Sequence, residues 1–154
     1  MFHLKKQKDV ITELEKNNDR SKVIIALLDF ESQGVSQIYS STLSDIIQSF
    51  LINSRALTVV ERKDMEKIIK EQNFQLSGCT TNECAVKVGK ILNARKIFLG
   101  SINFLNDQYF INIRSIDVET GENDFAIQEK FNEKIDIEEM GELLSNKLII
   151  EIIK

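Results

Sequence analysis

Two kinds of hydrophobic pattern alternate in the first part of the chain. Continuous apolar runs at residues 23–30 and 57–60 predict short strands, the first of them buried on both faces. Between them, apolar residues recur with helical spacing from Val35 to Leu51, after a break at Gly34. A strand, a crossover helix and a second strand make a right-handed βαβ unit, so we expect these two strands to be parallel.

Two further amphipathic patterns predict helices over residues 61–73 and 81–93. Thr80 and Glu83 have the spacing of a capping box, in which both side chains satisfy unpaired amides at a helix start. Asn93 is a suitable C-terminal stop for the second of these helices.

Alternating patterns then predict three strands, at residues 96–105, 109–118 and 124–131. Residues 106–108 join the first two as a hairpin, and Gly121 can supply a positive φ in the second turn. A closing helix begins near residue 137. The order β-α-β-α-α-β-β-β-α predicts an α/β domain with a mixed sheet of about five strands and helices packed on it.

The chain divides into a short N-terminal segment and one domain. Residues 1–21 carry few apolar positions and are expected to be helical or flexible, whereas residues 22–154 form the domain. A chain of 154 residues is long enough to build a core without disulfide or metal crosslinks.

Charge and hydropathy exclude two classes of partner. The net charge is -4 and both signs are mixed along the chain, so we expect no nucleic-acid partner. No run approaches the ~20 apolar residues of a transmembrane segment. The N-terminus has basic residues without an apolar stretch behind them, so it is not an intact signal peptide. Two explanations stay open: a cytoplasmic protein, or a mature region whose leader is missing.

Cys79 and Cys84 bracket four residues at the start of a predicted helix. One interpretation is a local disulfide, which would contribute about 2 kcal/mol in the chain-entropy model and imply an oxidising compartment. Another is a redox-active thiol at Cys84, favoured by the helix dipole, and a third is two unlinked residues. Two thiols and the single histidine, His3, fall short of a structural zinc site, so we expect no metal.

The sequence contains no recognisable catalytic set, and we expect no enzyme. Any triad-type arrangement would have to use His3, which lies in the terminal segment. Asp29 and Glu31 follow the first strand at the end where open α/β sheets bind ligands, so they are weak candidates for a ligand site. The favoured alternative is that these carboxylates cap a helix or face water. No glycine-rich phosphate loop is present, and we expect no cofactor.

An ordered set of short motifs resembles the CsgG-like family over roughly residues 22–131. That family comprises curli-secretion channel subunits and related LpoB-type lipoproteins that activate penicillin-binding proteins, the peptidoglycan synthases. The matching positions are Leu28-Asp29-Phe30, Val59-Val60-Glu61-Arg62, Glu71-Gln72, Leu76-Ser77-Gly78, Gly89 to Leu92, Gly100-Ser101 and Asp117 to Gly121.

Four of the matched residues suggest structural roles. The Arg62 guanidinium at the strand-to-helix junction can satisfy loop carbonyls or a carboxylate, and Glu61 complements the helix dipole. Glu71 and Gln72 are expected to anchor the loop that follows. The family's pore-forming hairpins have no counterpart, because the turn at residues 104–109 is short, so we expect no pore.

The resemblance implies a non-enzymatic accessory or assembly protein of the cell envelope with a protein partner. Its location would be periplasmic, in association with the outer membrane through a leader or lipid anchor that this chain lacks. The apolar end of the closing helix, residues 148–153, is a candidate partner contact or homo-oligomer seam. The alternative function is a small cytoplasmic ligand-binding or regulatory domain that uses Asp29 and Glu31.

Overall fold

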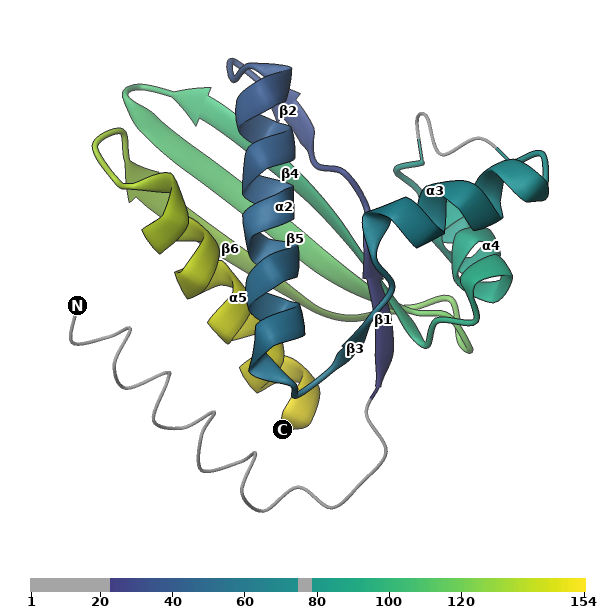
Figure 1. Ribbon diagram of the computed structural model, residues 1–154. Coiled ribbons are helices and arrows are strands. Elements are labelled where there is room, and N and C mark those ends of the chain that lie inside the picture. The colour runs from purple at the N-terminus through teal and green to yellow at the C-terminus, as the bar shows by residue number, and fades with distance from the viewer. Residues whose placement is uncertain (1–22, 75–78) are drawn as a thin grey trace.

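The computed structural model describes residues 23–74 and 79–154, which form a mixed sheet flanked by helices (Figure 1). Its elements are, in chain order, β1 (Ile24–Leu27), β2 (Glu31–Gln33), α2 (Gln37–Ser54), β3 (Thr58–Val59), α3 (Arg62–Glu71), α4 (Asn82–Leu92), β4 (Lys96–Leu105), β5 (Gln108–Asp117), β6 (Asn123–Asn132) and α5 (Ile137–Ile153). The predicted α/β class and element order are confirmed, with β2 as an additional strand. The predicted segment 1–21 lies outside the described residues.

The sheet has six strands, in the order β3-β1-β4-β5-β6 with β2 also beside β4. β1 is parallel to both β3 and β4, as the predicted βαβ unit requires, whereas β4, β5 and β6 form an antiparallel meander. The β4–β5 turn consists of Asn106 and Asp107, whose φ angles are 53° and 60°. Positive φ at both positions is typical of the tight hairpin turn whose twist matches the flanking strands.

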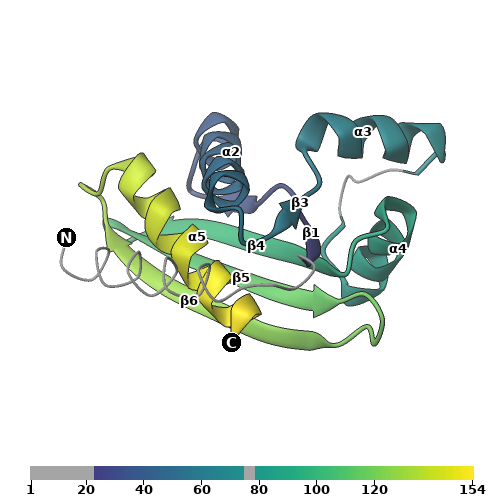
Figure 2. The same ribbon diagram turned by 60° about the horizontal axis from the view of Figure 1, so that its bottom comes forward.

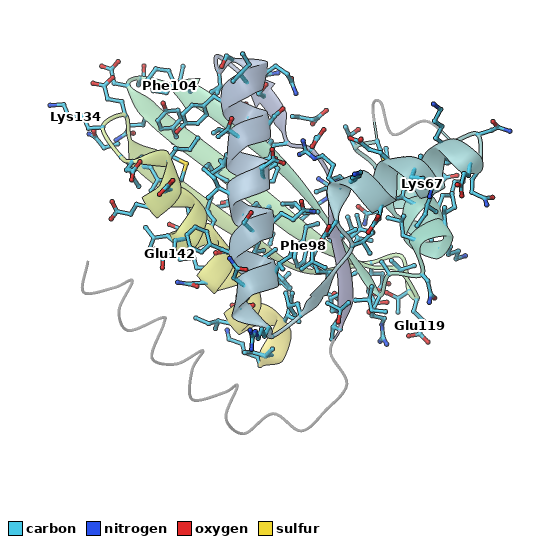
Figure 3. All side chains as sticks on the ribbon, in the orientation of Figure 1. Lys67, Phe98, Phe104, Glu119, Lys134 and Glu142 are labelled. Atoms are coloured by element: carbon cyan, nitrogen blue, oxygen red, sulfur yellow. A yellow bond between two sulfur atoms is a disulfide. The ribbon has the colours of Figure 1, made fainter. Side chains whose placement is uncertain are left out.

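Two hydrophobic clusters lie on opposite faces of the sheet. The larger cluster lies between the sheet and helices α2 and α5 (Figure 2), and includes Ile25, Leu43, Ile47, Phe98, Leu144 and Leu148. Figure 3 shows Phe98 beside α2 near the middle of the sheet, where its ring meets Phe125 edge-on at 6.2 Å. The smaller cluster joins α3 and α4 to the other face, and includes Ala26, Met65, Ile69, Val88, Ile97 and Ile116.

The smaller cluster covers only part of its face. Helices α3 and α4 lie at one end of the sheet, near β1 and the β5–β6 turn (Figure 2). Further along β4 and β5, Leu105 and Phe110 are 61% and 37% exposed. Within the described residues, no helix covers this part of the sheet.

The apolar end of α5 is part of the larger cluster. Leu148 and Ile149 are fully buried, and Ile150, Ile152 and Ile153 are partly buried against the same cluster. Core packing therefore accounts for these side chains, and the structure gives no separate support to the predicted seam.

The start of α4 corrects the predicted capping box by one residue. The N-cap is Thr81, whose Oγ1 accepts a hydrogen bond from the Cys84 amide at 3.1 Å. Thr81 has the extended backbone of an N-cap residue, whereas Thr80 precedes the helix and offers its carbonyl elsewhere. At the other end, Asn93 adopts φ 57°, the left-handed conformation of a helix stop.

β1 and β2 lie one after the other along the same edge of β4, separated by residues 28–30. Ala26 lies opposite Ile97, and Glu31 lies opposite Ser101. The chain therefore advances by five residues from Ala26 to Glu31, whereas β4 advances by four over the same length. One extra residue in a strand bends it and changes which face the following side chains take.

The extra residue decides the environment of residues 28–30. Leu28 belongs to the smaller cluster and Phe30 to the larger, whereas Asp29 between them is exposed. The ring of Phe30 lies against the backbone of Gly100, where an added Cβ would come within 2.5 Å of ring atom Cε1. The missing side chain of Gly100 therefore makes room for Phe30 to cross β4.

We predict that Gly100→Ala destabilises the protein by about 1–3 kcal/mol, because the new methyl group overpacks the buried Phe30 ring. Chemical denaturation measures the change, and Ser101→Ala on the next residue should stay within about 0.5 kcal/mol of the wild type. Equal effects of the two substitutions would contradict a specific need for glycine beneath Phe30.

The turn between β5 and β6 is held by the carboxylate of Asp117. Its Oδ1 accepts hydrogen bonds from the amides of Glu119 at 2.8 Å and Thr120 at 3.1 Å. Burial raises the pKa of Asp117, but these amides and the cations of Lys96 and Arg95 lower it, and the net pKa lies below its usual value. A depressed pKa means that the ionised form stabilises the fold.

Asp117→Asn should therefore cost about 1–2 kcal/mol at neutral pH, because the amide oxygen still accepts the bonds but the charge is lost. The contribution of Asp117 is present above the unfolded pKa of about 3.9 and is lost as the pH falls through the lower folded pKa. Urea titrations at pH 7 and at about pH 2 should show a smaller difference between wild type and variant in acid. An equal difference at both pH values would contradict the role of the charge.

Candidate binding groove at the end of β1

A cavity of about 340 Å³ opens at the carboxyl end of β1. We call it the strand-end groove, and its lining residues are Leu28, Asp29, Phe30, Glu31, Gln37, Arg62, Met65, Glu66, Cys79 and Thr80. The structure therefore brings together both carboxylates proposed from the sequence, the matched arginine and one of the two cysteines.

Arg62 at the start of α3 is the central cation of the strand-end groove. Its Nη2 forms ion pairs with the carboxylates of Asp29 and, at 3.2 Å, Asp45 in α2. Both carboxylates are more than half exposed, so each pair contributes at most about 1 kcal/mol. The arrangement instead orients three elements relative to one another, because one guanidinium bridges the β1–β2 link, α2 and α3.

The neighbouring Glu61 is the N-cap residue of α3, and its side chain makes no capping hydrogen bond. Its charge lies at the end of the helix where the dipole favours an acid, and its structural role stays a prediction. Gln72 is the C-cap of the same helix, with its amide bonded to the carbonyls of Ile68 and Ile69. Glu71 is exposed, and residues 75–78 lie outside the described part, so anchoring of that loop stays a prediction.

A second hollow of about 90 Å³ continues the groove toward the sheet. It shares Asp29, Glu31, Cys79 and Thr80 with the strand-end groove. Its other lining residues are Leu99, Gly100, Ser101, Asn112 and Arg114. The two hollows therefore form one depression that runs from α3 onto the uncovered face of the sheet.

Arg114 of β5 holds the wall of this depression. Its Nη2 donates a hydrogen bond to the carbonyl of Thr80, in the loop before α4. Arg114 was not predicted as a site residue, although a cation in the alternating strand Ile111-Asn112-Ile113-Arg114 was a visible signal. Asp45 was also missed, because nothing in the polar face of α2 distinguishes it.

A disulfide joins Cys79 to Cys84, with their Cα atoms 5.5 Å apart. This separation lies within the usual range for disulfides. The bond closes the short loop that carries Thr80 and the N-cap Thr81, so it supports both the groove wall and the start of α4. In this state neither cysteine is a free thiol.

The chemistry of the strand-end groove is that of charge recognition. Three carboxylates, Asp29, Glu31 and Glu66, share it with the guanidinium of Arg62. No group of three metal-ligating side chains occurs among the residues described, and His3 lies outside them. No helix within residues 23–74 and 79–154 is long and apolar enough to cross a membrane.

The double substitution Cys79→Ser/Cys84→Ser should lower the free energy of unfolding by about 2 kcal/mol, because it removes a short covalent loop closure. Reduction of the wild type with dithiothreitol should cause a similar loss, measured by chemical denaturation. The double variant is the control and should not respond to the reductant. A wild type whose stability is unchanged by reduction would contradict the structural role of the disulfide.

Comparison with solved structures finds the same fold in other proteins. The LpoB C-terminal domain from Escherichia coli matches with a TM-score of 0.64 and 9% identity over 82% of this chain and 95% of that chain. TolB from Acinetobacter baumannii matches with a TM-score of 0.62 and 13% identity, over 86% of this chain and 29% of that chain. The LpoB C-terminal domain from Salmonella enterica has a TM-score of 0.61 and 10% identity, over 82% of this chain and 95% of that chain.

These identities are low, so the likenesses show a shared fold and nothing more. Comparison with curated proteins finds no match. Among protein families, the model described as "Curli production assembly/transport component CsgG" matches residues 6–109. This match spans more than half of the chain and includes the strand-end groove residues from β1 to α4, so the chain belongs to the CsgG family.

Proposed function

We propose that this chain is a non-enzymatic accessory protein of the cell envelope, whose domain works in the periplasm by docking on a protein partner. Membership of the CsgG family carries the proposal, since the family is described as an assembly and transport component. The partner belongs to an envelope assembly or is a peptidoglycan synthase, as the resemblance of the sequence motifs implies. A leader or anchor outside this chain would associate it with the outer membrane.

Two features of the structure support the envelope location and the accessory role. The Cys79–Cys84 disulfide is the kind of bond that persists in oxidising compartments such as the periplasm. In the strand-end groove, Arg62 is occupied by Asp29 and Asp45, an arrangement that orders structural elements. Docking through one face needs about 800 Å² per partner, which a domain of this size readily offers.

The strand-end groove itself favours a second candidate function, a small cytoplasmic ligand-binding or regulatory domain. Its volume of about 340 Å³ is at the lower end of the range for small-molecule sites. It lies at the carboxyl end of a parallel strand, where open α/β sheets bind their ligands. This function requires reduced cysteines and a cytosolic location, so it differs from the first in a measurable way.

Thiol trapping in the source cells separates the two functions. Cells are alkylated rapidly and fractionated, and the peptide that holds Cys79 and Cys84 is examined by mass spectrometry. We expect an unalkylated, disulfide-linked peptide in the envelope fraction, because the periplasm keeps such bonds oxidised. Cysteines of an abundant cytosolic protein in the same sample are the control and should be fully alkylated. Two alkylated thiols in the cytosolic fraction would overturn the envelope proposal and favour the ligand-binding one.

A further inference from the structure

The uncovered part of the sheet carries a regular array of polar side chains. Neighbouring strands place residues opposite one another, so two rows cross β4, β5 and β6 on the face away from α2 and α5. The rows are Ser101, Asn112 and Gln128, and next to them Asn103, Phe110 and Lys130. β2 extends them with Glu31 opposite Ser101 and Gln33 opposite Asn103. We call these two rows the open sheet face.

The open sheet face offers unused hydrogen-bonding groups around one aromatic ring. Gln33, Ser101, Asn103, Asn112 and Gln128 are uncharged, and their side chains make no hydrogen bond to any residue that the structure describes. Each amide side chain supplies two donors and one acceptor oxygen. Phe110 lies on β5, between Asn103 of β4 and Lys130 of β6, and 37% of its surface is exposed.

The charges of the open sheet face are few and opposite. Glu31 lies at the β2 end of one row and Lys130 at the β6 end of the other. A nucleic acid would require many more cations than Lys130 and the neighbouring Arg114 provide. The large apolar side chains here are Phe110 and Leu105, and neither fills a packed pocket of the kind that anchors a protein interface.

The open sheet face is also hollowed and continuous with the groove. A depression of about 410 Å³ is lined by residues of both rows, among them Ser101, Asn103, Phe110 and Asn112. It shares Ser101 and Asn112 with the 90 Å³ hollow that leads to the strand-end groove. From β2 to β6 the face spans about 14 Å, because neighbouring strands lie about 4.8 Å apart. A continuous track of this kind suits an elongated ligand.

We propose that the open sheet face binds a linear, uncharged glycan chain. A sugar ring has one face of C–H groups and a rim of hydroxyls. The C–H face can pack on the exposed Phe110 ring, while the hydroxyls exchange hydrogen bonds with the free amides of Asn103, Asn112 and Gln128. The near-neutral balance of the face matches an uncharged polymer. This binding site is separate from the protein docking proposed above and does not rest on it.

Titration of the isotope-labelled protein with hexa-N-acetylchitohexaose and with cellohexaose tests the proposal by NMR. Both probes are linear and uncharged, but only the first carries acetamide groups, so the comparison shows whether hydroxyls alone suffice. We expect at least one probe to shift the amide signals of residues 101–103, 110–112 and 128–130. No shift at these residues with either probe at millimolar concentration would overturn the proposal.

Matched variants locate the site on the open sheet face. Phe110→Ala should weaken binding about tenfold, and Asn112→Ala should weaken it as well. Ile38→Ala and Asn53→Ala are the controls, since both residues are exposed on α2 and should leave the affinity unchanged. Thermal unfolding verifies that the variants fold, and a folded Phe110→Ala that binds as tightly as the wild type would overturn the proposal.

A measurement in cells addresses the other possible occupants. A photo-crosslinking amino acid at Gln128, in the centre of β6, should capture carbohydrate-containing material. A crosslink from Gln128 to another protein, or to a second copy of this chain, would show that the open sheet face is covered by a polypeptide. That result would overturn the proposal while leaving the thiol-trapping test of the envelope location unaffected.

Discussion

The contact between Phe30 and the bare backbone of Gly100 determines most of what lies at the end of β1. The Phe30 ring lies against Gly100, and the link between β1 and β2 holds one residue more than the matching part of β4. That residue turns Asp29 outward, where Arg62 reaches it from the first turn of α3. The absent side chain of Gly100 therefore leaves room for Phe30, whereas α3 is held on the sheet by Met65 and Ile69 and reaches the same corner through Arg62.

The two faces of the sheet are used differently. One face is closed by α2 and α5, which approach so closely that a Cβ on Gly141 would come within 2.4 Å of the Ile46 side chain. On the other face, α3 and α4 cover one end and leave the rows around Phe110 exposed. The closed face holds the larger of the two hydrophobic clusters, and α3 and α4 bury the smaller one, so the exposed part of the sheet can carry polar groups at little cost to stability.

The hydrophobic pattern was sufficient to predict the fold class and nearly all of the elements. The parallel pairing of β1 and β3 followed from the length of the apolar runs and the helix between them. β2 was missed because Glu31-Ser32-Gln33 has no apolar residue, and only its pairing with β4 makes it a strand. The cap of α4 was placed one residue early because adjacent threonines satisfy the same motif, and only backbone conformation separates Thr80 from Thr81.

The candidate site was predicted less completely than the fold, for a physical reason. Asp29, Arg62 and Cys79 were identified because each stands at the end of an element, where side chains meet. Asp45 and Arg114 come from the middle of α2 and β5, and only the three-dimensional arrangement brings them to the site. The open sheet face was also not predicted. The alternation of apolar and polar residues along a strand is the same whether the polar side chains face solvent or a ligand.

The strand order also has a consequence for how the chain reaches this fold. The β4–β5–β6 meander closes through short turns, such as the two residues Asn106 and Asp107. β1 must instead find β4 across some seventy residues, since Ile25 pairs with Lys96. Closing that longer loop costs on the order of 2 to 3 kcal/mol more chain entropy than closing a turn. We therefore expect the meander to form early and serve as a template, and the insertion of β1, which completes the groove, to be slower.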